Sequence, residues 1–332
     1  MRLDMANDIT QQPLRPHSEQ LAGEAIAAVI VAFNPDTDFG QRVNVVLPQV
    51  ARVIIVDNAS LIPVRETLAG APYDRMDIIE NLQNMGIATG LNQGVRRAAQ
   101  LGFAWVLTLD QDTDVDATMV SDLWSILSHC PVRDSIGIVG SNGRTKYSGR
   151  VYIDCTGQAS DFIERKTLAT SGSLMSLRAY EHVGPFRDDF FIDGVDLEYC
   201  LRLRRYGFKV LISCKPLMTH VGGKGEEHCL LGRPVIVLKH PPWRYYYLLR
   251  NLTQISRSYV KQEPGWVFSQ WMNDMPKLFI KIGFFEDNKL EKVKHMLLGI
   301  RDGMGRVMRS TVKVPRPDGK VESNGNRTQE RL

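Results

Sequence analysis

The sequence lacks a hydrophobic run long enough to cross a membrane. No stretch approaches the roughly 18 consecutive apolar residues of a spanning helix. The polar start, MRLDMANDITQQPLRP, has no apolar segment typical of a secretory signal. The net charge is only +4 over 332 residues, which is too small to indicate nucleic-acid binding. These absences predict a cytoplasmic protein without a nucleic-acid partner, whose only membrane contact would be peripheral, on the inner face of the cytoplasmic membrane.

Cysteine is scarce and scattered. The five cysteines form no C-x-x-C pair and stand at Cys130, Cys155, Cys200, Cys214 and Cys229. An odd, dispersed set predicts reduced thiols, not a disulfide framework or a zinc site.

The glycines form no phosphate-binding fingerprint either. Gly86, Gly90 and Gly94 match neither G-x-G-x-x-G nor a Walker loop. We interpret them as points of close helix–strand packing.

Short apolar runs recur along the first half of the chain. Ala25 to Phe33 is apolar throughout, which is typical of a strand buried on both faces of a parallel sheet. Further strands are predicted at 53–56, 76–81 and 106–109, with a helix through 95–101. This alternation predicts an α/β fold with a mostly parallel sheet.

The composition also divides the chain. We expect a loose arm over 1–24, a catalytic domain over 25–240, a helical region over 241–313 and a disordered tail over 314–332.

Polar residues gather near the expected strand ends. Asn34, Asp57, Asn92 and Asp110 all fall close to that edge in the predicted order. Ligands of open α/β sheets bind outside the carboxyl ends of the strands. One pocket is therefore expected to collect these four residues.

The stretch VLTLDQDTD, residues 106–114, places carboxylates at every second position. Asp110, Asp112 and Asp114 repel one another unless a positive charge lies between them. A divalent cation is the simplest candidate, because Mg²⁺ binds one or two carboxylates together with substrate phosphates. The pattern predicts a metal site that serves a nucleotide diphosphate.

A second acidic cluster opens a predicted helix over 195–206, which Gly207 would end. The cluster consists of Asp193, Asp196 and Glu198. One of these carboxylates could act as a general base. The alternative is helix capping together with a Glu198–Arg202 pair one turn apart. Both interpretations stay open at this point.

Together, these motifs resemble family 2 glycosyltransferases, more narrowly the rhamnosyltransferases of bacterial surface-polysaccharide assembly. The resemblance runs in order over about residues 25–310. It is carried by AFNPD (32–36), VDNAS (56–60), NMGIATGLNQG (84–94), LDQDT (109–113), TSGSL (170–174), FIDGVDLEYCLR (191–202), THVGG (219–223) and RYYYLLRN (244–251).

The resemblance implies a nucleotide-diphospho-sugar transferase fold of the GT-A type, with a mostly parallel mixed sheet flanked by helices and a C-terminal helical extension. It implies that Mg²⁺ or Mn²⁺ is bound by Asp110 and Asp112, with His220 nearby. Asp196 matches the second acid of the family's Glu-Asp base motif. The first acid is Val195 here, which leaves the role of Asp193 open.

The resemblance also implies a nucleotide-sugar site. Asp57 would bind the pyrimidine base, and residues 32–34 would line the nucleoside. The full set comprises Ala32, Asn34, Asp57, Asn58, Gly86, Asn92, Asp110, Gln111, Gly172 and Arg250.

The implied reaction is inverting transfer of L-rhamnose from dTDP-L-rhamnose to a lipid-linked oligosaccharide, in O-antigen or another surface polysaccharide. One alternative is a UDP-sugar donor, such as UDP-galactofuranose or UDP-N-acetylglucosamine. Another is a sugar-nucleotide-binding partner that has lost catalysis, although the intact Asp110, Asp112 and Asp196 argue against it.

The chain becomes aromatic and basic after residue 240. Its most aromatic segment, Trp266 to Phe285, carries Lys277 and Lys281. Such a segment could lie on the membrane surface, near lipid-linked acceptors. It could equally pack on the catalytic domain or on a second subunit of a homo-oligomer.

Overall fold

The computed structural model describes residues 26–68, 73–146, 149–220, 226–230, 233–305 and 312. The side chains of residues 220, 226–230 and 233–236 lie outside this description. The predicted N-terminal arm over 1–24 and the tail over 314–332 also lie outside the described residues.

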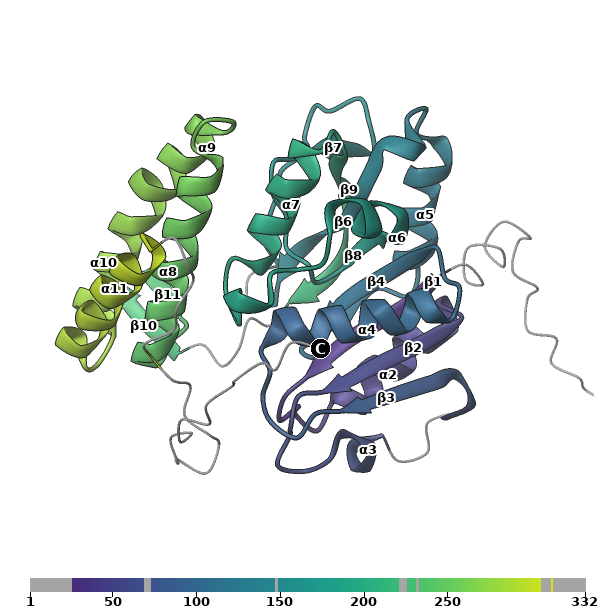
Figure 1. Ribbon diagram of the computed structural model, residues 1–332, viewed down its shortest axis with the longest axis horizontal. Helices are drawn as coiled ribbons and strands as arrows, with labels where there is room; N and C mark the ends of the chain where they lie inside the picture. The colour runs from purple at the N-terminus through teal and green to yellow at the C-terminus, as the bar shows by residue number, and fades with distance from the viewer. Residues whose placement is uncertain are drawn as a thin grey trace, which may run out of the picture.

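Among the described residues, a nine-stranded sheet forms the centre of the molecule (Figure 1). Its strands are β1 Ile26–Ala32, β2 Arg52–Asp57, β3 Met76–Glu80, β4 Trp105–Asp110, β5 Thr113–Val115, β6 Ile136–Thr145, β7 Phe162–Glu164, β8 Ser173–Ser176 and β9 Lys209–His220. Eight of them follow the order β3-β2-β1-β4-β8-β6-β9-β5, and β7 pairs with β9. Strands β3, β2, β1 and β4 are parallel, whereas β8 runs antiparallel to both of its neighbours. The predicted α/β class with a mixed sheet is confirmed, although antiparallel pairings are as frequent as parallel ones in the described strands.

Helices cover both faces of the sheet (Figure 1). Those of the sheet region are α2 Phe39–Val46, α3 Val64–Thr67, α4 Ile87–Gln100, α5 Met119–His129, α6 Leu177–Val183 and α7 Val195–Arg205. Every residue of β1 is buried, and alternate residues point into two separate apolar clusters. Side chains added at Gly90 and Gly94 would collide with Val31 and Val29 of β1. These two glycines therefore provide the close helix–strand packing expected from the sequence.

The C-terminal extension is helical beyond a short hairpin of β10 Glu226–Leu230 and β11 Arg233–Val237. Its helices are α8 Pro242–Tyr259, α9 Pro264–Ser269, the π-helical turn η5 Gln270–Asp274, α10 Met275–Phe285 and α11 Lys289–Gly303. They lie together on one side of the sheet (Figure 1). Ile255 and Tyr259 of α8 belong to the same apolar cluster as Val195 and Tyr199 of α7. The extension therefore shares a core with the sheet.

The aromatic segment after residue 263 is divided between packing and exposure. Trp266 is buried against the sheet region and donates from Nε1 to Thr167 Oγ1 (3.3 Å). Trp271 donates to Ser256 Oγ of α8 (2.9 Å). Phe279 and Phe284 are exposed. No helix in the described part of the chain combines the length and apolar character needed to span a bilayer.

One prediction about the cysteines is wrong. Cys155 and Cys214 form a disulfide, whereas Cys130 and Cys200 are free and buried. The two half-cystines are separated by 59 residues, yet the chain after β6 turns back and brings their Cα atoms within 5.6 Å. That distance lies inside the range a disulfide can bridge. Spacing along the sequence could not reveal this pairing, because it depends on the loop lying against β9.

Candidate active site

The carboxyl ends of β1, β2 and β4 meet at one edge of the sheet. The strand register pairs Ala32 with Asp57, and Val31 with Asp110. The Gln111 side chain strengthens this edge, because its amide accepts from Phe33 N (2.6 Å) and donates to Phe33 O (3.2 Å). The structure thus brings the expected nucleoside residues beside the expected metal residues.

The loops after β1 and β2 are tied to each other. The Asn34 side chain accepts from Leu61 N through Oδ1 (2.7 Å), and the Asn34 backbone nitrogen donates to Ser60 Oγ (2.9 Å). The buried Asp57 carboxylate accepts from the backbone nitrogens of Ser60 and Val64 (both 2.9 Å). Each carboxylate oxygen has a further lone pair. Asp57 is therefore a fixed acceptor at the place where the resemblance expects the pyrimidine base.

Two other predicted ligands are occupied within the protein. Asn58 is buried and holds the 81–86 loop through bonds to Asn81, Asn84, Met85 and Gly86. Gly86 has a φ of +83°, and its backbone lies against the carbonyl of Phe191. These contacts shape one wall of the site.

Asn92 lies elsewhere than the sequence suggested. It is in the second turn of α4 and not at the end of a strand. It is fully buried, donates to Phe186 O and Asp188 Oδ1 (both 2.8 Å), and accepts from Tyr180 Oη (2.8 Å). The structure brings Asn34, Asp57 and Asp110 to the sheet edge, whereas Asn92 fastens α4 to the segment before α7.

The three alternating carboxylates have different surroundings. Asp114 is bound by Arg42 Nε (2.9 Å) and lies 3.8 Å from Lys146 Nζ. The backbone nitrogen of Asp110 donates to Ser171 Oγ (3.0 Å), and Gly172 N donates to Thr108 O in β4 (2.8 Å). Protein cations therefore neutralise Asp114, while the 171–172 turn braces Asp110.

The chemistry of the remaining pair fits a hard divalent cation. Among the described residues, no three His, Cys, Asp or Glu side chains are close enough to hold a metal. Asp110 and Asp112 carry the carboxylate oxygens that Mg²⁺ prefers, and such a pair could hold the ion together with substrate phosphates. The backbone of His220 pairs with Thr113, adjacent to Asp112. The His220 side chain lies outside the described residues.

Helix α7 presents the predicted base at this edge. The helix begins after Gly194 and ends before Gly207, both with φ in the left-handed region. Burial raises the pKa of Asp196 to about 6, and the negative charges of Asp110 and Asp193 act in the same direction. The turn before α7 also meets the wall formed by the 81–86 loop, because Phe191 O accepts from Ile87 N (2.7 Å). A carboxylate with a raised pKa is a stronger base than an ordinary aspartate.

The two neighbouring carboxylates have cationic partners. Asp193 makes a two-pronged contact with Arg244 of α8, at 3.1 Å from Nε and 3.0 Å from Nη2. Glu198 is buried and accepts from Arg202 Nη2 and Tyr259 Oη (both 2.9 Å). The Glu198–Arg202 pair is confirmed.

Helix α8 holds the turn before α7. Asn251 Nδ2 lies 2.9, 2.8 and 2.7 Å from the carbonyl oxygens of Phe190, Ile192 and Asp193. Arg250 is also buried and donates to the carbonyl of Asp189. Arg250 was expected to bind the nucleotide sugar. In the structure its guanidinium instead helps to hold the turn before α7.

Three contributors to the site were missed in the sequence. Arg42 neutralises Asp114, Arg244 neutralises Asp193, and Asn251 fixes the turn before α7. The RYYYLLRN motif contains both Arg244 and Asn251, so it carried a signal. Only the fold shows which carboxylate or carbonyl each one meets.

Residues 27–182 match the model of glycosyl transferase family 2. This part of the chain is a family 2 glycosyltransferase domain. A relative, the dTDP-rhamnosyl transferase RfbF of Shigella flexneri, is 27% identical over 249 residues, which cover 68% of this chain and 78% of that protein. The family domain, with its mixed sheet and flanking helices, agrees with the expected GT-A fold.

Two solved structures are similar to the chain. A crystal structure of S. aureus TarS aligns over 84% of this chain at 10% identity, with a TM-score of 0.48. The alignment spans about half of TarS, 54% of its chain. A crystal structure of a mycobacterial protein aligns over 74% of this chain and 80% of that one, at 14% identity and a TM-score of 0.45.

Substitutions should distinguish the roles of the three carboxylates near α7. Asp196→Asn keeps the size and removes the base, so kcat should fall about 10²–10⁴-fold while donor affinity changes little. Glu198→Gln should instead lower the free energy of unfolding by about 1–3 kcal/mol, because it weakens a buried charged pair. Steady-state kinetics and urea denaturation measure the two effects. Loss of turnover in Asp193→Asn with retention in Asp196→Asn would assign the base to Asp193.

Proposed function

We propose that this chain transfers L-rhamnose from dTDP-L-rhamnose to a lipid-linked glycan of a bacterial surface polysaccharide, with inversion at the anomeric carbon. The observation that carries the proposal is the environment of Asp196 at the start of α7. Burial raises the pKa of this carboxyl, and the negative charge of Asp110, at the carboxyl edge of the sheet, acts in the same direction. Similarity to a dTDP-rhamnosyl transferase supports the choice of donor.

Different residues of the site would bind the donor and activate the acceptor. Asp57 accepts a hydrogen bond from the pyrimidine N3–H, and residues 32–34 line the nucleoside. Asp196 takes the proton of the acceptor hydroxyl while that oxygen forms a bond to the anomeric carbon of the donor. The bond from this carbon to the diphosphate oxygen breaks, and dTDP leaves with the electron pair.

Asp110 and Asp112 would hold Mg²⁺ or Mn²⁺, and His220 would lie near it. When bound, the cation stabilises negative charge on the nucleoside diphosphate. The protein residues around the pair keep their geometry through the Ser171 and Gln111 hydrogen bonds.

A donor screen tests the proposed activity. We expect dTDP release from dTDP-L-rhamnose to exceed UDP release from UDP-galactofuranose and UDP-N-acetylglucosamine, since the donor is chosen by its sugar as well as its base. Nucleotide release is measured with and without a lipid-linked acceptor. Faster UDP release would show that the donor is a UDP-sugar. Nucleotide binding without release from any donor would identify a non-catalytic binding protein. Asp196→Asn is the matched control.

Metal dependence is a separate prediction. Excess EDTA should abolish turnover, and Mg²⁺ or Mn²⁺ should restore it, because two carboxylates beside a diphosphate need a cation between them. Asp112→Asn should raise the Mg²⁺ concentration needed for half-maximal rate, measured by metal titration. Full activity in excess EDTA contradicts the metal assignment of Asp110 and Asp112.

We also propose that the segment of α9, η5 and α10 contacts the membrane that carries the acceptor. Their exposed apolar residues are Phe268, Met272, Phe279, Ile280 and Phe284. Lys277, Lys289 and Lys294 are exposed on α10 and α11. Lys281 takes no part in this surface, because it pairs with the buried Glu286 (3.0 Å). Exposed aromatic residues with nearby lysines suit an anionic lipid surface.

Vesicle binding tests this surface. The protein should sediment with phosphatidylglycerol vesicles, less at high salt and less with phosphatidylcholine. Replacing both Phe279 and Phe284 by Ser should weaken binding about tenfold or more. Leu82→Ser, an exposed leucine elsewhere, is the control. Unchanged sedimentation of the double variant overturns the proposal, and a dimer that dissociates in this variant assigns the surface to a second subunit.

A further inference from the structure

The segment after β6 is held firmly against the sheet. Tyr152 N donates to Gly143 O (2.9 Å), and the buried Asn142 side chain donates to Ile153 O (2.8 Å) and accepts from Ile153 N (3.2 Å). Cys155, three residues after Tyr152, forms a disulfide with Cys214 of β9. Tethers to both β6 and β9 thus fix residues 152–155.

This rigid segment presents an aromatic ring. A Cβ added at Gly143 would lie 2.5 Å from the Tyr152 ring, so one part of the ring lies directly on the β6 backbone. The residue nonetheless remains 48% exposed. A fixed, half-exposed ring loses little conformational entropy when a ligand binds to it.

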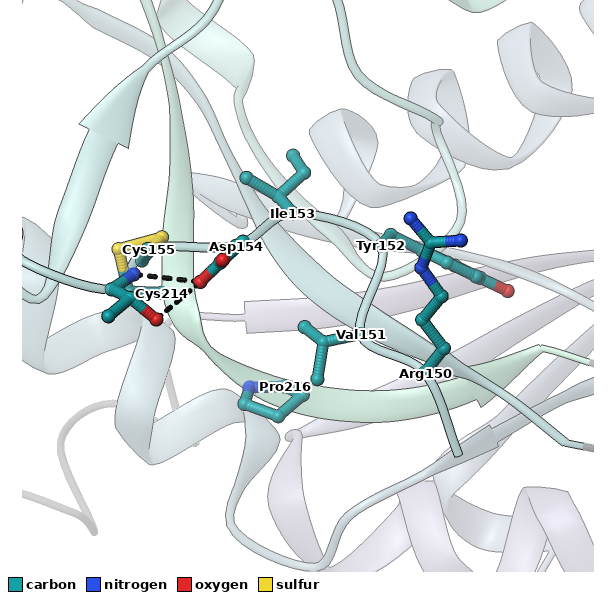
Figure 2. Close-up of a pocket in the computed structure, with 9 residues that line it drawn as sticks. Arg150, Val151, Tyr152, Ile153, Asp154, Cys155, Cys214 and Pro216 are labelled. Carbon is teal, nitrogen blue, oxygen red and sulfur yellow. Dashed lines mark hydrogen bonds between the residues drawn. A yellow bond between two sulfur atoms is a disulfide. The ribbon is translucent and has the colours of Figure 1, made fainter. Parts of the chain in front are cut away.

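Tyr152 stands at one end of a cavity of about 510 Å³ (Figure 2). The opposite end is formed by Asp154, whose carboxylate accepts from Thr156 N (2.9 Å) and Oγ1 (2.6 Å), and by the disulfide. The lining alternates apolar and polar groups and consists of Arg150, Val151, Tyr152, Ile153, Asp154, Cys155, Thr156, Cys214 and Pro216. Sugars have apolar C–H faces and polar edges, and a tyrosine offers both an apolar body and a hydroxyl. The lining matches that chemistry.

The cavity lies apart from the expected nucleoside site. The expected base and nucleoside residues lie on β1 and β2, on one side of β4. The cavity lies along β6 and β9, on the other side of β4 and its Asp110. A donor whose nucleoside rests at β1 and β2 leaves this side to the second substrate.

We infer that the cavity is a carbohydrate subsite for the acceptor glycan, with Tyr152 as the ring on which an acceptor sugar packs. The inference rests on the proposed glycosyl transfer. Tyr152 here is a specificity-determining residue, and the base remains Asp196.

The test measures sugar binding apart from turnover. Methyl α-L-rhamnoside, methyl β-N-acetylglucosaminide and methyl β-galactoside are offered separately to the dTDP-loaded protein, and saturation-transfer NMR reports binding. Wild type should bind at least one of them. Tyr152→Ala should weaken that binding about fivefold or more, whereas Tyr152→Phe should stay within about twofold, because the ring carries the contact. Tyr206→Ala, an exposed tyrosine at the end of α7, is the matched control.

The outcomes distinguish this inference from the proposed function. Unchanged dTDP affinity in Tyr152→Ala shows that the fold and the donor site persist. Equal glycoside binding by Tyr152→Ala and wild type overturns the subsite, as does the absence of binding by all three glycosides. The proposed glycosyl transfer is tested by a different measurement. It fails if the wild-type protein releases no nucleotide from any donor.

Discussion

The site depends on one turn and the helix that holds it. Phe191, Asp193 and Gly194 all have φ between +59° and +77°, a region that costs energy for residues other than glycine. Asn251 of α8 compensates by contacting three carbonyl groups of this turn. Since α7 starts where the turn ends, the position of Asp196 follows from a residue 55 positions later in the chain.

The helix that holds this turn also shares an apolar core with the sheet region. Arg244 and Arg250 reach the turn from the same helix, one toward the Asp193 carboxylate and the other toward a backbone carbonyl. A single helix thus supplies charge and hydrogen bonds to the start of α7. The C-terminal region belongs to the active site as support, whatever surface its exposed face meets.

Charge is distributed unevenly over the acidic groups of the edge. Arg42, Arg244 and Arg202 lie against Asp114, Asp193 and Glu198, respectively. Burial beside Asp110 instead raises the pKa of Asp196. The three arginine pairs lower the electrostatic cost of folding an acidic edge. The raised pKa of Asp196 is the feature that a general base uses.

The sequence alone determined strands β1 to β4, helix α7 and the acidic motifs, because apolar runs, helix-ending glycines and pairs one turn apart are local patterns. Gly207 and the Glu198–Arg202 pair followed from such spacing. Only the tertiary structure decided which distant groups meet. Asn92 was misplaced because its partners lie near residues 180–188, and the disulfide was missed because its halves are 59 residues apart. Contacts of this kind depend on how the chain crosses the sheet, which residue spacing does not encode.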